Sequence, residues 1–263
     1  MKKLLARLCV EWMMACAQRV FFVYGMRRSG NHACVGWLVN SLEREAVALT
    51  ESDHVKNFNY SGSGATFYAN DVSTLASRRY LKCLYHDLKK IRAAKFIIIS
   101  AEDKTADYRQ SWRIPRRSET IFVHRDTLNL MASRFQNLNR RAREGLGANM
   151  QSMKAKFFAT LMANIERPQG LVWDFERWHH EKAWRMSFLS QLGLDCDILP
   201  STVGLGSSFS SDRQVIPNSK VGQRFTMVEP RDAWISFIRG AASQYPDAFT
   251  PAEHASIRQL VTP

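Results

Sequence analysis

The stretch VFFVYGMRRSGNHACVGWL, residues 20–38, decides the fold. An apolar run, Val20–Tyr24, leads into a loop that is bounded by Gly25 and Gly30 and contains two arginines, and an amphipathic segment follows at once. This order predicts a strand, a basic loop and a helix over about residues 31–45. Backbone N–H groups and the dipole at the start of such a helix favour an anion. The stretch therefore predicts a phosphate-binding loop.

The spacing of the two glycines matches the Walker A pattern of nucleotide kinases, GxxxxGK[ST]. Asn31 and His32, however, stand where that pattern requires a Lys and then a Ser or Thr. We therefore expect a loop that binds phosphate by its architecture and does not carry out ordinary ATP hydrolysis. Trp37 lies far enough along the helix that we expect it in the core.

The composition is that of a globular protein with a large positive charge. The chain has 263 residues, of which 45% are hydrophobic, and its 37 Lys and Arg exceed its 24 Asp and Glu by 13. No linker rich in Pro, Gly or Ser divides it, so we expect one domain over 1–263. Within that domain we expect an N-terminal amphipathic helix (1–19), a phosphate-binding core (20–225) and C-terminal helices (226–263). The charge predicts an anionic ligand or partner.

Cysteine usage and the N-terminus bear on where the protein works. The five cysteines are odd in number and scattered without metal-ligand spacing, which favours a reducing compartment. The N-terminus imitates a signal peptide, but Arg7 and Glu11 interrupt its apolar stretch. No stretch has the length of a membrane span. We expect a cytoplasmic protein without a bound metal, whose N-terminal helix packs on the domain or a partner or serves peripheral membrane association.

Strands and helices alternate along the chain. Short apolar runs predict strands at 47–49, 96–99, 120–123 and 171–173. Helical periodicity predicts helices over 71–94, 127–143, 147–165, 176–192 and within 229–260. The polar, glycine-containing segments 51–70 and 200–225 are expected to be loops. The alternation predicts an α/β fold of three layers, with a mostly parallel central sheet flanked by helices and a P-loop-like architecture.

A second group of chemically suggestive residues follows the strand at 120–123. Arg125 comes directly after it, at the carboxyl end where open α/β sheets bind ligands. Ser133 comes eight residues later, about two helical turns further on. The two side chains meet one anion only if the helix folds back over it. An alternative for Arg125 is a surface ion pair with Asp126.

The loop and the second group together resemble the motifs of PAPS-dependent sulfotransferases, where PAPS is 3′-phosphoadenosine-5′-phosphosulfate. Residues 28–32 (RSGNH) resemble the degenerate P-loop of that family, which holds the 5′-phosphosulfate. Arg125 and Ser133 resemble the pair that holds the 3′-phosphate. Residues 172–176 resemble a strand-end segment near the adenine, and the loop at 204–209 falls where the family closes a basic loop over the nucleotide, with basic residues beyond it at Arg213, Lys220 and Arg224.

The resemblance implies PAPS as the cofactor, released as adenosine 3′,5′-bisphosphate, with no metal. It assigns binding roles to Arg27, Arg28, Ser29, Gly30, Asn31, His32, Arg125, Ser133, Phe175 and Arg213. This chain departs from the family at two positions. Arg28 replaces the usual Lys, and Ala33 stands where a Trp often packs on the adenine. An arginine stabilises developing charge but is a poor proton donor.

Transfer to an acceptor hydroxyl or amine also requires a general base within hydrogen-bond reach. Glu102, just after the strand at 96–99, is the first candidate, since the resemblance places a base at the comparable strand end. Asp103 and His54 are alternatives. We expect Glu102 and Arg28 to be the catalytic residues.

The charge favours an anionic acceptor, such as an acidic saccharide or peptide. The surface that binds this acceptor could consist of Trp112 and two arginine clusters: Arg113, Arg116 and Arg117, and Arg140, Arg141 and Arg143. Runs of charged residues are, however, commonly solvated faces. Two other functions compete. One is a P-loop nucleoside or sugar kinase, but this chain lacks the Lys of the Walker A pattern. A nucleic-acid-binding protein would fit the charge, but the sequence shows neither a zinc finger nor an RNP-like strand, so no specific nucleic acid is expected.

Overall fold

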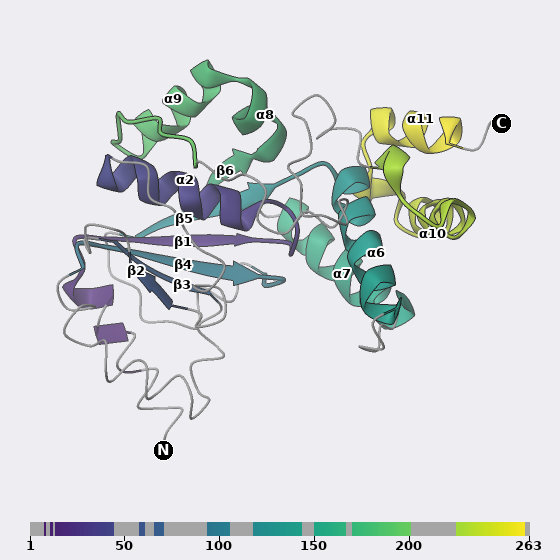
Figure 1. The fold of residues 1–263 in the computed structure, drawn as a ribbon, viewed down its shortest axis with the longest axis horizontal. Coiled ribbons are helices and arrows are strands. Elements are labelled where there is room, and N and C mark those ends of the chain that lie inside the picture. The colour runs from purple at the N-terminus through teal and green to yellow at the C-terminus, as the bar shows by residue number, and fades with distance from the viewer. Residues whose placement is uncertain are drawn as a thin grey trace.

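The structure is a computed structural model, which describes residues 8, 11–12, 14–44, 58–60, 66–70, 94–105, 118–143, 150–166, 170–200 and 225–260. Its centre is a six-stranded sheet in the order β2-β3-β4-β1-β5-β6 (Figure 1). The strands are β1 (Arg19–Gly25), β2 (Phe58–Tyr60), β3 (Thr66–Asn70), β4 (Phe96–Glu102), β5 (Ser118–His124) and β6 (Leu171–Asp174). Neighbouring strands are parallel except β2 and β3, which are antiparallel. The expected α/β fold with a mostly parallel sheet is confirmed.

Helices flank the sheet and extend beyond its carboxyl edge. They are α2 (Asn31–Glu43), α6 (Thr127–Arg143), α7 (Met150–Glu166), α8 (Phe175–His180), α9 (Lys182–Gln191), α10 (Arg231–Gln244) and α11 (Pro251–Gln259), with a short 3₁₀ helix at Pro246–Ala248. In Figure 1, α2, α8 and α9 cover one face of the sheet, and the helical residues before β1 lie on the other side. Helices α6 and α7 stand beside the carboxyl ends of the strands, and α10 and α11 lie beyond them.

The central strand is buried along its whole apolar length, since both of its neighbours run parallel to it and helices cover the sheet. Behind it, Trp37 of α2 packs edge-on against Trp178 and tilted against Phe188, with ring centroids 6.3 and 6.0 Å apart. Trp37 is fully buried and donates its indole N–H to Asp197 at 2.8 Å. The expectation that Trp37 is a core residue is confirmed.

A second buried cluster joins α6, α7, α10 and α11. Phe135 of α6 packs against Trp234 of α10, with ring centroids 5.4 Å apart. Phe158 of α7 stacks on Tyr245 at 4.4 Å. These contacts fix α6, and with it the residues that α6 carries toward the sheet edge.

The prediction that residues 51–70 form one loop is wrong, because β2 and β3 lie within it. Both strands are rich in aromatic residues, which favour pleated sheet over loop. Tyr68 of β3 is buried, and β3 adds to the sheet parallel to β4. The polar residues between the two strands made the whole segment resemble a loop, so its aromatic residues were not recognised as a sign of strands.

The single helix predicted over 176–192 is also wrong, because the chain breaks at Glu181 into α8 and α9. Glu181 is extended, with φ −114° and ψ 98°. The buried Arg185 guanidinium donates to the Trp178 carbonyl at 2.9 Å, and Arg185 also pairs with Asp197 at 2.9 Å. A side chain therefore satisfies a carbonyl at the end of α8 that a continuous helix would have bonded internally.

The remaining predicted elements agree with the structure within a few residues where it describes them. The helices expected from 127, 147 and 229 correspond to α6, to α7 and to α10 with α11. Helical backbone at residues 8, 11–12 and 14–16 agrees with the N-terminal helix, and Met14 is buried. Predictions at 47–49, 71–93 and 201–224 lie outside the described residues. Among the described helices, none combines the length and the apolar character needed to cross a membrane.

Candidate functional site

The strand, loop and helix predicted from the first motif are present. β1 ends at Gly25, a turn follows in which Ser29 N–H donates to the Met26 carbonyl at 2.9 Å, and α2 begins at Asn31. Arg28 and Gly30 have left-handed backbone, with φ 78° and 111°. The loop thus turns sharply just before the first helical bond, as a phosphate-binding loop requires.

The two glycines of the loop are required by close contacts. A Cβ on Gly25 would lie 2.7 Å from the Val123 carbonyl oxygen of β5. A Cβ on Gly30 would lie 2.5 Å from the ring of Phe175 at the start of α8. The loop is therefore pressed against the carboxyl ends of β5 and β6, where the second predicted group of residues lies.

On the side of β4, Asp103 fixes the loop. Its carboxylate accepts the Arg27 backbone N–H at 2.8 Å and the Arg134 guanidinium at 2.7 Å, and its own N–H donates to the Gly25 carbonyl at 3.0 Å. Burial raises the pKa of Asp103, but Arg134 and the hydrogen bonds more than offset it and leave this pKa below its ordinary value. Because its oxygens are engaged, Asp103 is a poor general base and a good anchor.

Glu102, the last residue of β4, has looser contacts. Its carboxylate lies 3.4 Å from Arg27 Nε and 3.8 Å from His32 Nε2, and the side chain is 20% exposed. Burial raises the pKa of Glu102, although the positive charge of Arg27 opposes the shift. A carboxyl group with a raised pKa, partly open to solvent, is suited to accept a proton.

A buried tyrosine extends this group. Tyr68 of β3 places its hydroxyl 3.5 Å from Nδ1 of His32, whose other ring nitrogen faces Glu102. The sequence did not predict a role for Tyr68, because it falls in the segment expected to be a loop. Its aromatic neighbourhood was the one signal that could have placed it on a strand.

On the side of β5 and β6, Arg125 is buried, with only 3% of the residue exposed. Its Nη1 donates to the Arg28 carbonyl at 3.0 Å, and its guanidinium lies over the Phe175 ring, 4.7 Å from the centroid. The alternative of a surface ion pair is therefore wrong. The Asp126 carboxylate instead accepts both the backbone N–H and the side-chain amide of Asn129.

Several buried polar atoms of this side have no hydrogen-bond partner within the described part of the chain. They are Nε and Nη2 of Arg125, Oε1 of Glu176 and Nδ2 of Asn31. Burial and the neighbouring Asp126 charge raise the pKa of Glu176 to about 8, although Arg125 opposes the shift. Native proteins rarely leave buried polar groups unpaired, so these atoms are candidate contacts for a ligand or an ordered water. Glu176 was not predicted to have a role of its own.

The other predicted residues take these positions. Arg28 donates to the Asn137 side chain at 2.8 Å, and the Ser29 hydroxyl donates to Asn31 Oδ1 at 3.0 Å. Ser133 is buried in the second turn of α6. Phe175 is buried between Gly30 and Arg125, so its assignment to the adenine stays a prediction.

The structure thus brings together nine predicted residues at one edge of the sheet: Arg27, Arg28, Ser29, Gly30, Asn31, His32, Glu102, Arg125 and Phe175. Other predicted residues lie outside the described residues: His54, Trp112, Arg113, Arg116, Arg117, Arg213, Lys220 and Arg224. The side chains of Arg140, Arg141 and Arg143, at the end of α6, are likewise not described.

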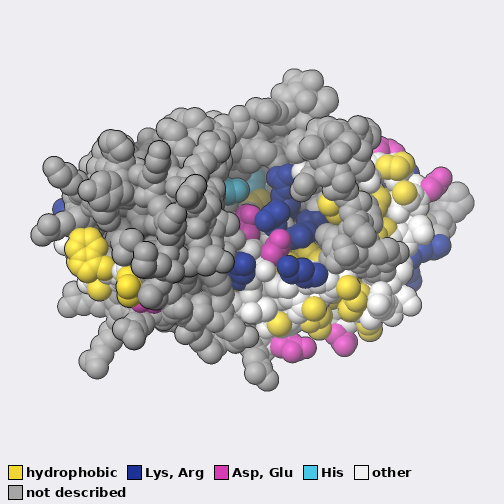
Figure 2. All heavy atoms as spheres, turned by 90° about the horizontal axis from the view of Figure 1, so that it is seen from below, with side chains coloured by type: hydrophobic (Ala, Val, Ile, Leu, Met, Phe, Trp, Pro, Cys, Tyr) yellow, Lys and Arg dark blue, Asp and Glu magenta, His cyan; other side chains and the backbone are white. Residues whose placement is uncertain are grey.

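The surface at this edge carries charges of both signs. Figure 2 shows Lys and Arg side chains gathered around a hollow in the middle of one face, with acidic side chains and a histidine beside them. Among the described residues, no group of three His, Cys, Asp or Glu is placed to hold a metal ion.

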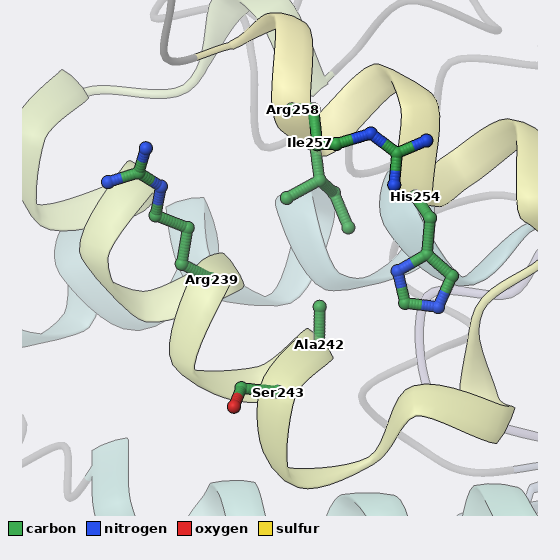
Figure 3. Close-up of a pocket in the computed structure, with 6 residues that line it drawn as sticks. All are labelled: Arg239, Ala242, Ser243, His254, Ile257 and Arg258. Atoms are coloured by element: carbon green, nitrogen blue, oxygen red, sulfur yellow. The ribbon is translucent and has the colours of Figure 1, made fainter.

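A pocket of about 340 Å³ lies elsewhere, between α10 and α11. It is lined by Arg239, Ala242, Ser243, His254, Ile257 and Arg258. In Figure 3 the two guanidinium groups extend to opposite sides, and the apolar side chains lie between them. The pocket therefore does not direct its two charges at one ligand, and it lies apart from the loop at 25–30 (Figure 1).

Comparison of the chain with protein-family models, with curated proteins and with solved structures finds no match. The functional conclusion therefore depends on the geometry of this site and on the motifs that it contains.

Proposed function

We propose that the protein is a sulfotransferase that moves a sulfuryl group from PAPS to a hydroxyl or amine of an acceptor. One observation carries the proposal. Arg125, the residue that the resemblance assigns to the 3′-phosphate, is buried beside the loop at 25–30 and keeps two N–H-bearing nitrogens without a partner in the described part of the chain.

The residues present fit a nucleotide with two phosphate-like groups. Arg125 Nε and Nη2 and Asn31 Nδ2 are buried donors without a partner in the described part of the chain. Backbone N–H groups of residues 30–32 would hold the 5′-phosphosulfate, since the Ser29 N–H already bonds the Met26 carbonyl, and Arg125 with Ser133 would hold the 3′-phosphate. PAPS, when bound, supplies the activated sulfuryl group.

The chain's own residues then stabilise negative charge on the transferring group and accept the proton of the acceptor. Arg27 and Arg28 stabilise negative charge electrostatically, and the bond to Asn137 holds the Arg28 guanidinium in place. Because an arginine stays protonated, Arg28 does not donate a proton to the leaving group. Glu102 accepts the proton of the acceptor hydroxyl, and its looser contacts and raised pKa favour it over the saturated Asp103.

We base the proposed class of acceptor on the net charge, and the proposed compartment on the cysteines. The surplus of 13 positive charges favours an anionic acceptor, such as an acidic saccharide or peptide. The described cysteines Cys16, Cys34 and Cys196 are free thiols, which fits the cytoplasm. A screen of acceptors with radiolabelled PAPS would identify the acceptor class.

A kinase is the nearest rival. It would need acidic groups at the strand edge for Mg²⁺. Asp103 already binds Arg134 and the Arg27 N–H, and Asp126 and Asp174 accept hydrogen bonds from Asn129 and from the Arg177 N–H. The Walker Lys is also missing, because Asn31 follows Gly30. These observations favour the sulfotransferase over the kinase.

Calorimetric titration of the protein with three ligands separates the rival functions. We expect adenosine 3′,5′-bisphosphate to bind in the presence of EDTA, more tightly than ATP with Mg²⁺ and more tightly than a short DNA duplex. Preference for Mg²⁺-ATP would favour the kinase, and preference for the duplex would favour a nucleic-acid-binding protein. Either result would overturn the proposal.

A further inference from the structure

The buried pair of Arg125 and Glu176 has an unusual arrangement. Arg125 Nε and Glu176 Oε1 lie 3.8 Å apart, too far for a hydrogen bond, and both atoms are buried without a partner in the described residues. The other oxygen of Glu176 accepts the Asp126 backbone N–H at 3.4 Å, which is a long contact. The guanidinium and the carboxyl group face each other without satisfying each other.

The other charged groups around Glu176 are engaged elsewhere. Between β5 and α6, Asp126 accepts two hydrogen bonds from Asn129, and its negative charge also raises the pKa of Glu176. At the end of β6, Asp174 caps α8 and lies 3.6 Å from His124 of β5. The pKa of His124 is raised, chiefly by its hydrogen bond to Asp174. Glu176 is thus the acid whose charge these neighbours leave uncompensated.

We propose that Glu176 is a further residue of the anion site on Arg125, and that this carboxyl group is neutral when the anion is bound, so that binding takes up a proton wherever the free protein holds Glu176 ionised. The inference rests on the proposed function, because it concerns the phosphate that Arg125 would hold. The O–H bond of the Glu176 carboxyl group forms with a proton that hydronium or the buffer acid gives up, and no other covalent bond changes.

The physical reason is competition for one cation. An ionised Glu176 next to Arg125 repels a phosphate in an environment where water screens charge poorly. A neutral carboxyl group removes that repulsion and leaves the two unpartnered nitrogens of Arg125 to the ligand. Its O–H also adds a donor at the site.

The surroundings already favour the neutral form. Burial and the Asp126 charge raise the pKa of Glu176 to about 8, and a bound anion would raise this pKa further. At pH 7 the group is then mostly protonated, and binding takes up little additional proton. Above pH 8 binding must bring a proton with it, so affinity falls as the pH rises.

Calorimetric titration with adenosine 3′,5′-bisphosphate from pH 7 to 9.5, in buffers of different ionisation enthalpy, tests the inference. The charge of the ligand is constant in this range, since the second pKa of a phosphate monoester is about 6. For the wild type we expect the affinity to fall by up to about tenfold per pH unit above pH 8, with uptake of up to about one proton. Glu176→Gln should bind without this pH dependence and without proton uptake.

Glu181→Gln is the matched control, because Glu181 is an exposed acid of the same segment that pairs with Arg177. It should behave as the wild type. Wild-type binding that is independent of pH, without proton uptake, would overturn the inference and leave the proposed function intact. A Glu176→Gln variant with the wild-type pH dependence would also overturn it. No binding at any pH would overturn both. If Glu176→Gln does not fold, the wild-type proton uptake decides alone.

Discussion

The two sides of the loop at 25–30 differ in whether their buried charged groups have hydrogen-bond partners. On the side of β4, Asp103 is bound by Arg134 and by the Arg27 backbone N–H. On the side of β5 and β6, Arg125 and Glu176 keep three buried atoms without hydrogen bonds in the described part of the chain. Both sides are built from the same kinds of residue, an arginine and an acid next to a strand end.

The difference indicates a division of work. A buried polar atom without a partner costs about 1–3 kcal/mol, so the fold gains nothing by leaving the second side unsatisfied. The satisfied side fixes the loop, and the unsatisfied side keeps its capacity for a ligand. Variants of the first side should therefore change stability, and variants of the second side should change binding.

The largest expected effect concerns Glu102, the exception on the β4 side because its contacts are loose. Glu102→Gln keeps the volume and removes the base, so we expect the rate of sulfuryl transfer to fall about 10²- to 10⁴-fold. The affinity for adenosine 3′,5′-bisphosphate, measured by calorimetry, should stay unchanged. Retained activity would remove Glu102 as the base.

The next effect distinguishes the two sides by binding. Arg125→Ala should weaken adenosine 3′,5′-bisphosphate by about 2–4 kcal/mol, roughly 30- to 1000-fold in Kd, because it removes charged donors from a buried site. Arg177→Ala is the control, since Arg177 is an exposed arginine near the same site that pairs with Glu181. Equal effects of the two substitutions in calorimetry would show that Arg125 acts through general charge alone.

An effect of similar size, on stability instead of binding, tests the contact that joins the loop to the β6 side. Gly30→Ala should lower the free energy of unfolding by about 2–4 kcal/mol, because it forces a Cβ into the Phe175 ring at a left-handed backbone. Gly193→Ala should cost about 1 kcal/mol, since Gly193 is also left-handed but has no atom within 4 Å of the added Cβ. Urea unfolding measures both, and equal costs would contradict the packing described for Gly30.

The smallest effect concerns the satisfied side and depends on pH. Asp103→Asn should lower the free energy of unfolding by about 1–2 kcal/mol at pH 7. Because folding lowers the pKa of Asp103, its contribution is present above pH about 4 and is lost as the pH falls through the folded pKa. The difference between the wild type and Asp103→Asn should therefore vanish in acid.

The control for this effect is Asp195→Asn, because Asp195 pairs with Arg44 on an exposed surface. Its free energy of unfolding should match that of the wild type throughout the pH range. A difference of equal size at Asp103 and Asp195 would contradict the role of Asp103 as an anchor of the loop.

The sequence predicted the parts of the fold that depend on local patterns. The run Val20–Tyr24 and the glycine-bounded loop were sufficient for β1, the turn and α2, because apolar continuity and glycine spacing act locally. The strands at 58–60 and 66–70 were not predicted, since their stability comes from pairing with each other and with β4. The break at Glu181 was missed because a distant side chain, Arg185, satisfies the carbonyl there.

The sequence identified several residues of the site but not the hydrogen bonds and ion pairs that they make. Arg125 and Glu102 were identified by their positions after apolar strands, and both lie beside the loop. That Asp103 is saturated follows from Arg134, which lies on α6 and whose approach no local pattern encodes. Oε1 of Glu176 is buried without a partner among the described residues because of how the start of α8 packs against the end of β5, which no local sequence pattern encodes.

The central claim is that Arg125 and the loop at 25–30 bind one nucleotide through two phosphate groups. A crystal structure of the protein grown with adenosine 3′,5′-bisphosphate and EDTA tests it most directly. We expect the 3′-phosphate within hydrogen-bond distance of Arg125 Nε and Nη2, and the 5′-phosphate on the N–H groups of residues 30–32. A nucleotide bound elsewhere, or bound here with Arg125 still unpaired, would contradict the claim.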